Sequence, residues 1–417
     1  MILRTTAFAA LLSGTALHAH AAAPSDVLSN YADIALAGYE DSLETAKTLK
    51  GALNALVAAP TAANLDAARA AWIAARVPYQ QTEAFRFGNP VVDAWEGKVN
   101  AWPLDEGLID YVAGNAGLND ENPFSDANVI ANPALDVSGT KVDAATITPE
   151  LLQSMHEIDG IEANVTTGYH AIEFLLWGQD LNGTEAGAGT RPVTDFDPAN
   201  CTGGNCERRI QYLLSAADLL ISDLEEAVVL WSEGGQGRNE VTADPAQGLV
   251  MAFTGMGSLS YGEQAGERMK LGLLLHDPEE EHDCFSDNTH ASHFYDGQGI
   301  QNVYLGTYTR IDGSMIEGPS LYDVVKEKDA DLADALKADI ETTMEKLGAI
   351  VASAEAGTAY DQLIAAGNED GNALVQDAID ALVAQTRNID RAVTAIGLEK
   401  IDFEGSDSLD SPNAVFQ

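Results

Sequence analysis

Long runs of apolar residues at three- and four-residue spacing constrain the fold of this chain more than any other feature. Between Asp26 and about Ala58 the spacing places one set of side chains on a single helical face: Tyr31, Ile34, Ala35, Tyr39, Leu43, Ala46, Leu49, Leu53 and Leu56. Similar patterns predict helices at about 63–84, 149–157, 168–177, 207–233, 320–354, 357–367 and 370–397, and helical character resumes after residue 246 up to Leu275. Few segments alternate with period two, so the sequence predicts an all-α fold.

Irregular segments interrupt the helices. Residues 115–148 and 178–206 are rich in Asn, Asp, Gly and Pro, which predicts long loops, and residues 276–300 are also predicted to be a loop. Loops of this length in a compact domain are often functional.

The break near 200–206 predicts two packed helical bundles. The expected domains are 22–206, 207–403 and a polar tail at 404–417. In both halves, a long amphipathic helix is followed by an aromatic and acidic segment and then by a loop. This order hints at an internal duplication.

The N-terminus resembles a secretory signal peptide. Arg4 precedes an apolar stretch from Thr5 to Leu17, and Ala19-His20-Ala21 has the small-x-small cleavage pattern. We therefore expect a signal peptide at 1–21 and an exported, periplasmic mature protein. No later stretch is long and apolar enough to span a membrane, although peripheral association with the cell envelope is compatible with the sequence.

The charge balance is strongly acidic. The 417 residues include 65 Asp and Glu against 22 Lys and Arg, a formal net charge of −43. Nucleic acid is an unsuitable partner, because phosphate binding needs clustered cations. Metal ions, cationic partners and an acidic surface suited to salty water all fit this composition.

The chain has three cysteines. Cys201 and Cys206 bracket a short Gly-rich loop, which predicts a local disulfide in an exported protein. Cys284 is left over, as a buried free thiol or as a ligand together with nearby histidines.

The strongest functional candidate is a His and a Glu inside an apolar run. His170 and Glu173 are three residues apart between Gly168 and Gly178, so a helix would present both on one face. A buried Glu is costly unless it is paired or metal-bound. Alone, such a pair is more often a surface ion pair. Mixed nitrogen and oxygen ligands in a helical bundle suit iron, zinc or manganese.

Further ligands would have to come from elsewhere in the chain. Glu83, Asp105 and Asp110 are the candidates, because they lie among aromatic residues just before the first long loop. Each of them taken alone is equally an ordinary surface carboxylate.

Two downstream segments are weaker candidates. Residues 279–293 hold several carboxylates, Cys284 and three histidines, including His282 and His290, but a solvated acidic loop is the commoner explanation. Glu263, Glu267 and Arg268 lie on a predicted helix, where a structural ion pair is expected before catalysis.

Established hydrolase motifs are absent from the sequence. His156-Glu157 begins like a His-Glu-x-x-His motif but lacks the second His. No Gly-x-Ser-x-Gly and no phosphate-binding loop occur. The sequence therefore leaves enzymatic activity open.

The run Gly-x-His-x-x-Glu, followed by aromatic and apolar residues and Trp-Gly-Gln-Asp, resembles the signature of the imelysin family. The resemblance covers most of the mature length and is carried by residues 72–87, 168–180 and 262–306; the last block is similar to the iron-regulated members. It implies two helical bundle-like domains, a site near their interface and export, with His170 and Glu173 as the signature pair. The family takes its name from a peptidase, and its relatives include a periplasmic component of ferrous-iron uptake.

These observations favour an exported metal-binding protein of iron uptake or homeostasis. Iron is the favoured ion, with zinc or calcium as alternatives, and iron-uptake components of the cell envelope are the expected partners. A metal-dependent peptidase using the same pair is the first rival hypothesis, and a non-catalytic scaffold is the second.

Overall fold

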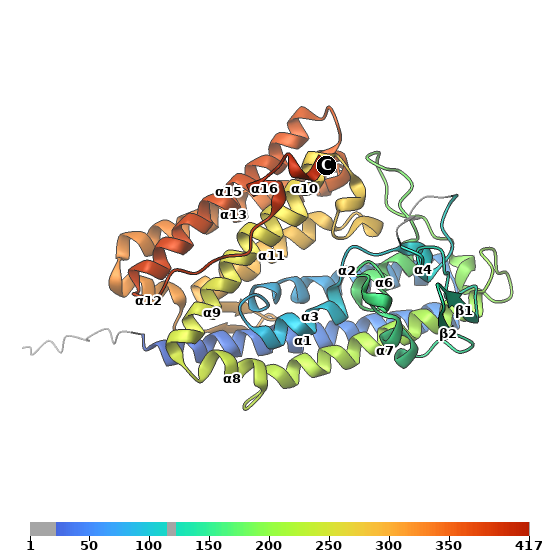
Figure 1. Cartoon of the computed structure of the whole chain (residues 1–417), viewed down its shortest axis with the longest axis horizontal. Helices are drawn as coiled ribbons and strands as arrows, with labels where there is room; N and C mark the ends of the chain where they lie inside the picture. Colours follow the sequence, from blue (N-terminus) through green and yellow to red (C-terminus); the bar gives the residue numbers. More distant parts are fainter. Residues whose placement is uncertain (1–21, 115–121, 417) are drawn as a thin grey trace, which may run out of the picture.

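The computed structural model describes residues 22–114 and 122–416, so the predicted signal peptide at 1–21 lies outside the described residues. Helices make up most of the described chain and strands very little of it, which confirms the predicted all-α class (Figure 1). Strands occur as two short antiparallel hairpins, β1 (Ala134–Val137) with β2 (Thr140–Asp143) and β3 (Thr307–Thr309) with β4 (Met315–Glu317).

The first part of the chain forms a helical bundle in which α1 packs against α2 and α7, and α6 packs against α2, α3 and α7. Its helices are α1 (Pro24–Ala58), α2 (Ala62–Gln80), η1 (Glu83–Phe85), α3 (Pro90–Asn100), α4 (Glu106–Ile109), α5 (Pro149–Met155), η2 (Ile158–Gly160), α6 (Gly168–Trp177), η3 (Val193–Phe196), α7 (Cys206–Trp231), α8 (Gln236–Thr242) and α9 (Pro245–Ser258).

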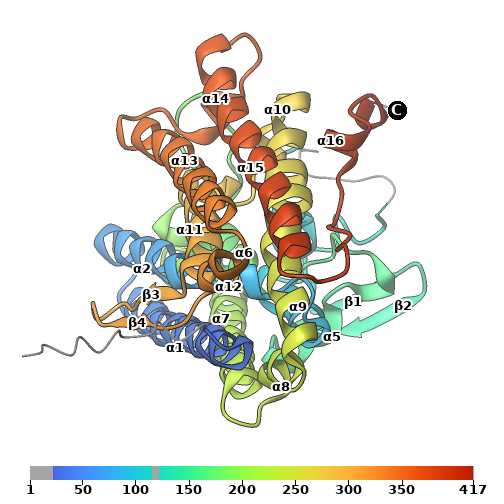
Figure 2. The same cartoon turned by 90° about the vertical axis from the view of Figure 1, so that its left-hand side faces the viewer.

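The second part lies against this bundle, with α13 and α15 on the far side from α1 in both views (Figures 1 and 2). Its helices are η4 (Leu259–Lys270), α10 (Leu271–Leu275), η5 (Pro278–Glu280), η6 (Cys284–Ser286), α11 (Thr289–Leu305), α12 (Leu321–Lys328), α13 (Ala330–Glu355), α14 (Tyr360–Ile364), α15 (Glu369–Ala395), α16 (Asp407–Asp410) and η7 (Ala414–Phe416). The whole of η4 is a π-helix, a form that is rare at this length.

Two apolar cores hold the molecule together. The larger runs through α1, α2, α6 and α7 and includes Trp72 and Trp231. The smaller lies between η4, α13 and α15 and includes Met269, Leu347 and Leu382. Helix α7 packs on α1. The predicted domain boundary near residue 206 stays a prediction.

The prediction of a loop across 276–300 is wrong over its second half, where α11 begins at Thr289. This helix has no single apolar stripe because it is packed between both parts of the molecule. A Cβ at Gly299 would lie 2.5 Å from the carbonyl oxygen of Gln81, and one at Gly297 would lie 2.5 Å from Leu347. Small residues that allow such close approach leave no amphipathic pattern for the sequence to show.

The helix predicted over 320–354 is also divided. Asp329 ends α12 and caps α13, where its side chain accepts a hydrogen bond from the Leu332 N–H at 3.0 Å. Within 22–114 and 122–416, no helix has the length and apolar character needed to cross a membrane.

Candidate metal centre

Helix α6 carries the predicted pair and is buried along its whole length. It starts at Gly168, whose φ of +80° and close approach to α3 exclude a side chain: a Cβ there would lie 2.4 Å from the Val99 carbonyl oxygen. At its other end, the Arg69 guanidinium of α2 donates to the Leu176 carbonyl at 3.1 and 3.0 Å. Contacts at both ends therefore fix the position of α6.

His170 and Glu173 contact each other, as the spacing predicts. Nδ1 of His170 lies 3.2 Å from Oε2 of Glu173, and both side chains are fully buried. The other Glu173 oxygen accepts hydrogen bonds from the Ser286 N–H at 3.0 Å and from its hydroxyl at 2.6 Å. Burial, followed by the charge of Asp283, raises the pKa of Glu173 well above its usual value.

The segment around η6 supplies two more groups to this place. His170, His282 and Asp283 each offer a ligand atom, and these three atoms lie within 4.8 Å of one another. The His170 and His282 ring centroids are 4.7 Å apart. Among the described residues this is the one group of three His, Cys, Asp or Glu side chains close enough to share a metal ion.

Neighbouring side chains hold Asp283 and His282 in position. Arg76 of α2 contacts both oxygens of Asp283, with nitrogen–oxygen distances of 2.8 and 3.3 Å, and donates to Asn100 at 2.6 Å. The His282 Nδ1 lies 2.9 Å from the Ser292 hydroxyl of α11. Such outer contacts fix the orientation of potential ligands before an ion arrives.

The two histidines are suited to binding a cation. Burial, with the nearby Arg76 and Arg268 charges, lowers the pKa of His170 and of His282 well below the usual value, which favours the neutral imidazole that binds a metal ion. Nε2 of His170 is buried without a hydrogen-bond partner. An unsatisfied buried group costs about 1–3 kcal/mol, and a metal ion on this lone pair would remove the cost. Two imidazoles and a carboxylate are a donor set for iron, zinc or manganese.

The structure gives the other predicted ligands different partners. Glu83 lies 2.8 Å from an Arg268 nitrogen. Asp110 contacts two buried guanidinium groups, Arg191 at 2.7 Å and Arg209 at 2.6 Å. The structure does not bring these carboxylates to the group of three possible metal ligands, and each instead pairs with arginine at another place.

Asp105 and His290 also lie outside the group of three. Asp105 accepts a hydrogen bond from the Asn122 amide, and His290 contacts the Asp287 carbonyl at 3.1 Å. Local partners therefore occupy both side chains.

Arg268 forms an ion-pair cluster with Glu263, Glu83 and Asp296, at 2.7, 2.8 and 3.0 Å. This is the structural role that the sequence favoured for Glu263 and Arg268. Glu267, on the same helix, is exposed and faces a cleft.

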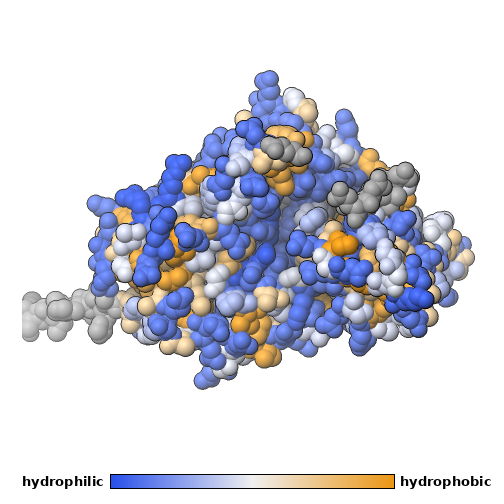
Figure 3. Space-filling model, in the orientation of Figure 1, coloured by the Kyte–Doolittle hydropathy of each residue, from blue (hydrophilic) through white to orange (hydrophobic). Residues whose placement is uncertain are grey.

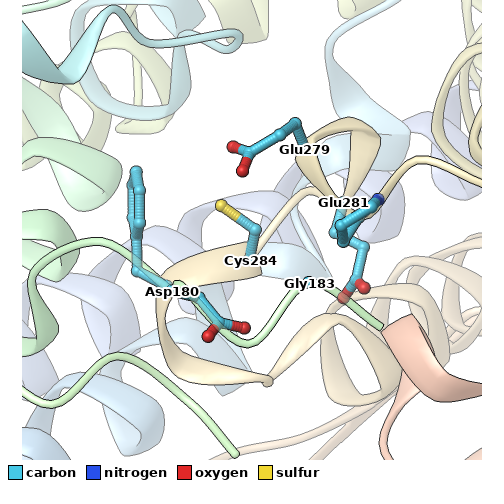
Figure 4. Close-up of a pocket in the computed structure, with 7 residues that line it drawn as sticks. Asp180, Gly183, Glu279, Glu281 and Cys284 are labelled. Carbon is cyan, nitrogen blue, oxygen red and sulfur yellow. The ribbon is translucent and has the colours of Figure 1, made fainter. Parts of the chain in front are cut away.

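The three cysteines fall in two environments. Cys201 and Cys206 are joined by a disulfide with their Cα atoms 5.9 Å apart. Cys284 is a buried free thiol, and burial raises its pKa well above the usual value. It lines a pocket of about 10 Å³ together with Asp180, Glu279 and other residues (Figure 4), which is space for about one water molecule.

A larger cleft connects the centre with the surface. It has a volume of about 650 Å³, and His282 and Trp102 are among its lining residues. Trp102 also packs on His170, with ring centroids 5.2 Å apart. Figure 3 shows a hydrophilic hollow near the middle of the face it presents.

The sequence singles out His170, Glu173 and His282 as candidates, but not Asp283 or Arg76. Asp283 lies within the acidic and histidine-rich segment 279–293 that the sequence singles out. The sequence marks this segment as a candidate, but it does not show which of the carboxylates lies beside His170. Arg76 lies in the 72–87 block that carries the family resemblance, but its contact with Asp283 depends on tertiary packing of α2 that no local pattern shows.

Comparison with known proteins finds a matching protein family and several similar proteins. The model of a family described as Imelysin, Peptidase_M75, matches residues 35–389. Iron-regulated protein A from Synechococcus elongatus is 47% identical over 60 residues, which are 14% of this chain and 17% of that protein. The chain thus matches less than a fifth of the length of this curated relative.

Solved structures share the fold. One, from Parabacteroides distasonis and assigned as an iron-regulated protein A precursor, has a TM-score of 0.63 and 17% identity, covering 89% of this chain and 95% of that one. An imelysin-like protein from Psychrobacter arcticum has a TM-score of 0.56 and 17% identity, covering 91% and 98%. From the family match over most of its length, the chain belongs to the imelysin family.

Proposed function

We propose that this protein binds a metal ion, iron by preference, through His170, His282 and Asp283. The observation that carries the proposal is the convergence of three buried ligand atoms to within 4.8 Å. Zinc and calcium are the alternative ions. The iron-regulated names of relatives support a role in iron uptake or homeostasis.

Glu173 has a distinct part in this proposal. A proton on Nδ1 of His170, shared with Glu173 at 3.2 Å, leaves the Nε2 lone pair free for the ion. Glu173 then orients His170, while its second oxygen is held by Ser286. Direct binding of the ion by Glu173, as the motif predicts, stays a prediction.

The proposed setting is the periplasm or the outer face of the cell envelope. The sequence pattern of residues 1–21 supports export, and one structural relative is described as a precursor. Iron-uptake components of the envelope are the proposed partners.

A metal-dependent peptidase is the second candidate, favoured by the family description and by the cleft that reaches His282. Such an enzyme needs a general base beside its metal. Of the two nearest carboxylates, Asp283 is itself a proposed ligand. The other, Glu173, contacts His170 and Ser286. Chelator-sensitive cleavage of an unfolded polypeptide would favour this candidate over a binding protein.

Thermal unfolding with ferrous, ferric, zinc and calcium ions tests the proposal. A ligand at a hundredfold excess over its dissociation constant stabilises the native state by about 2.7 kcal/mol. We expect iron to raise the melting temperature of the wild type but not of H170A. The matched control is H290A, because His290 lies near the centre in sequence but outside the ligand group.

Three other results would change the assignment. A metal-induced shift retained in H170A would exclude this site, and a shift lost in H290A would extend it. No shift with any ion would favour the scaffold hypothesis.

A further inference from the structure

The cleft that reaches the candidate metal centre is strongly acidic. Its lining contains seven carboxylates and two guanidinium groups. Both arginines are already engaged: Arg86 lies 3.0 Å from Asp93 and 3.4 Å from Glu96, and Arg268 lies 2.7 Å from Glu263. Neither cation is therefore free to receive an anionic ligand.

Four of the seven cleft carboxylates lack a cationic partner among the described residues: the half-buried Glu280 and three exposed ones. Glu157, Glu162 and Glu267 are exposed, and none has a Lys or Arg nitrogen within 4.0 Å in the part of the chain that the structure describes. The nearest basic group to Glu157 is His156, at 4.0 Å, and burial lowers the pKa of that imidazole. The negative charge of these three groups is uncompensated.

The location of these carboxylates, in the cleft that reaches the proposed ligands, matters more for ligand entry than the number of charges. The same cleft is lined by His282, one of the three proposed ligands, and by Trp102, which packs on a second, His170. A cleft lined by one sign of charge concentrates field lines and raises the local concentration of oppositely charged ligands. A ligand approaching through this cleft therefore passes the three uncompensated carboxylates before it reaches His282.

We infer that the species admitted to this site is a free cation rather than an anionic metal chelate, and that the cleft carboxylates steer it to His282. This inference rests on the proposed function. Size does not decide the matter, because a cleft of about 650 Å³ could hold a small chelate. Charge decides it: a polycarboxylate complex would meet like charges without a free cation to offset them.

The test is stopped-flow binding of Co²⁺, a paramagnetic ion that quenches tryptophan fluorescence, with Trp102 beside the site. The cleft variant is E157Q/E162Q/E267Q. The control variant, E44Q/E233Q/E317Q, removes the same charge from exposed carboxylates outside the cleft. We expect the cleft variant to bind about tenfold more slowly than wild type at low salt, and the control to match wild type.

Salt and a chelate complete the design. High salt should slow the wild type towards the rate of the cleft variant, because screening removes long-range steering. Fe(III)–citrate, an anionic complex, should quench far more slowly than Co²⁺. Equal rates for the two triple variants would overturn the inference, as would chelate binding as fast as that of the cation. If H170A retains wild-type Co²⁺ affinity, the proposed site itself is wrong, and the inference falls with it.

Discussion

At the scale of single residues, the surroundings of a carboxylate decide its role. Asp110 and Asp283 are both buried and both contact arginine. Asp110 is held by Arg191 and Arg209, which together lower its pKa despite burial. Asp283 contacts Arg76, and its Oδ1 also lies 3.9 Å from Nδ1 of His170. Only the second arrangement leaves a carboxylate oxygen beside potential metal ligands.

The Asp110 environment leads to a prediction. D110N should lower the free energy of unfolding by about 3–5 kcal/mol, because Asp195 alone would then face the two buried guanidinium groups that Asp110 contacts, and one charge would stay uncompensated. Urea unfolding measures this change. The control is D33N, which breaks an exposed pair with Arg238 and should cost about 1 kcal/mol or less. If D110N is as stable as D33N but fails to bind metal, the prediction is wrong and Asp110 is a metal ligand.

At the scale of elements, α6 depends on one glycine. Gly168 combines a positive φ with a contact to α3 that leaves no room for a Cβ. G168A should therefore cost about 3 kcal/mol or more, from backbone strain and displacement of α6, and should weaken metal binding. Denaturant unfolding and metal titration check the two effects.

A matched glycine separates strain from contact. Gly160 has a similar φ of +73°, but a Cβ there would meet nothing within 4 Å. G160A should cost only about 1–2 kcal/mol, the strain alone, and leave metal affinity unchanged. Equal losses in the two variants would mean that the α3 contact does not position α6.

At the scale of the whole molecule, acidic charge opposes folding as pH rises. Burial raises the pKa of Glu96 to about 7, that of Glu106 to about 8 and that of Asp287 to about 7. Each carboxyl binds its proton more tightly in the folded state than in the unfolded state. Their stabilising contribution is thus complete below the unfolded pKa near 4 and is lost as pH rises through 7 and 8.

The free energy of unfolding should therefore fall between about pH 6.5, above which the buried histidines with lowered pKa no longer oppose the trend, and about pH 8, by on the order of 2 kcal/mol. Urea titrations at several pH values in chelator-treated buffer measure the slope. E96Q should show a shallower fall, because one of the titrating groups is removed. A stability that rises across this interval would contradict the prediction.

The sequence by itself determined the helical class and the α6 bounds of Gly168–Trp177, because helical period and flanking glycines are local signals. It also determined that His170 and Glu173 share a face, since a spacing of three fixes this within one helix. The acidic charge and the Cys201–Cys206 pair were equally readable. In each case the deciding residues are neighbours along the chain.

Only the tertiary structure decided which distant groups join His170. Asp283 and His282 lie beside His170 because η6 packs against α6. Glu83 and Asp110 form ion pairs with Arg268 and Arg191 instead. The sequence around a carboxylate does not show which arginine it will pair with in the folded protein. Helix α11 escaped prediction for a related reason: a helix buried on several sides shows no amphipathic stripe. Local spacing sets what one helix presents, and packing between helices sets what faces it.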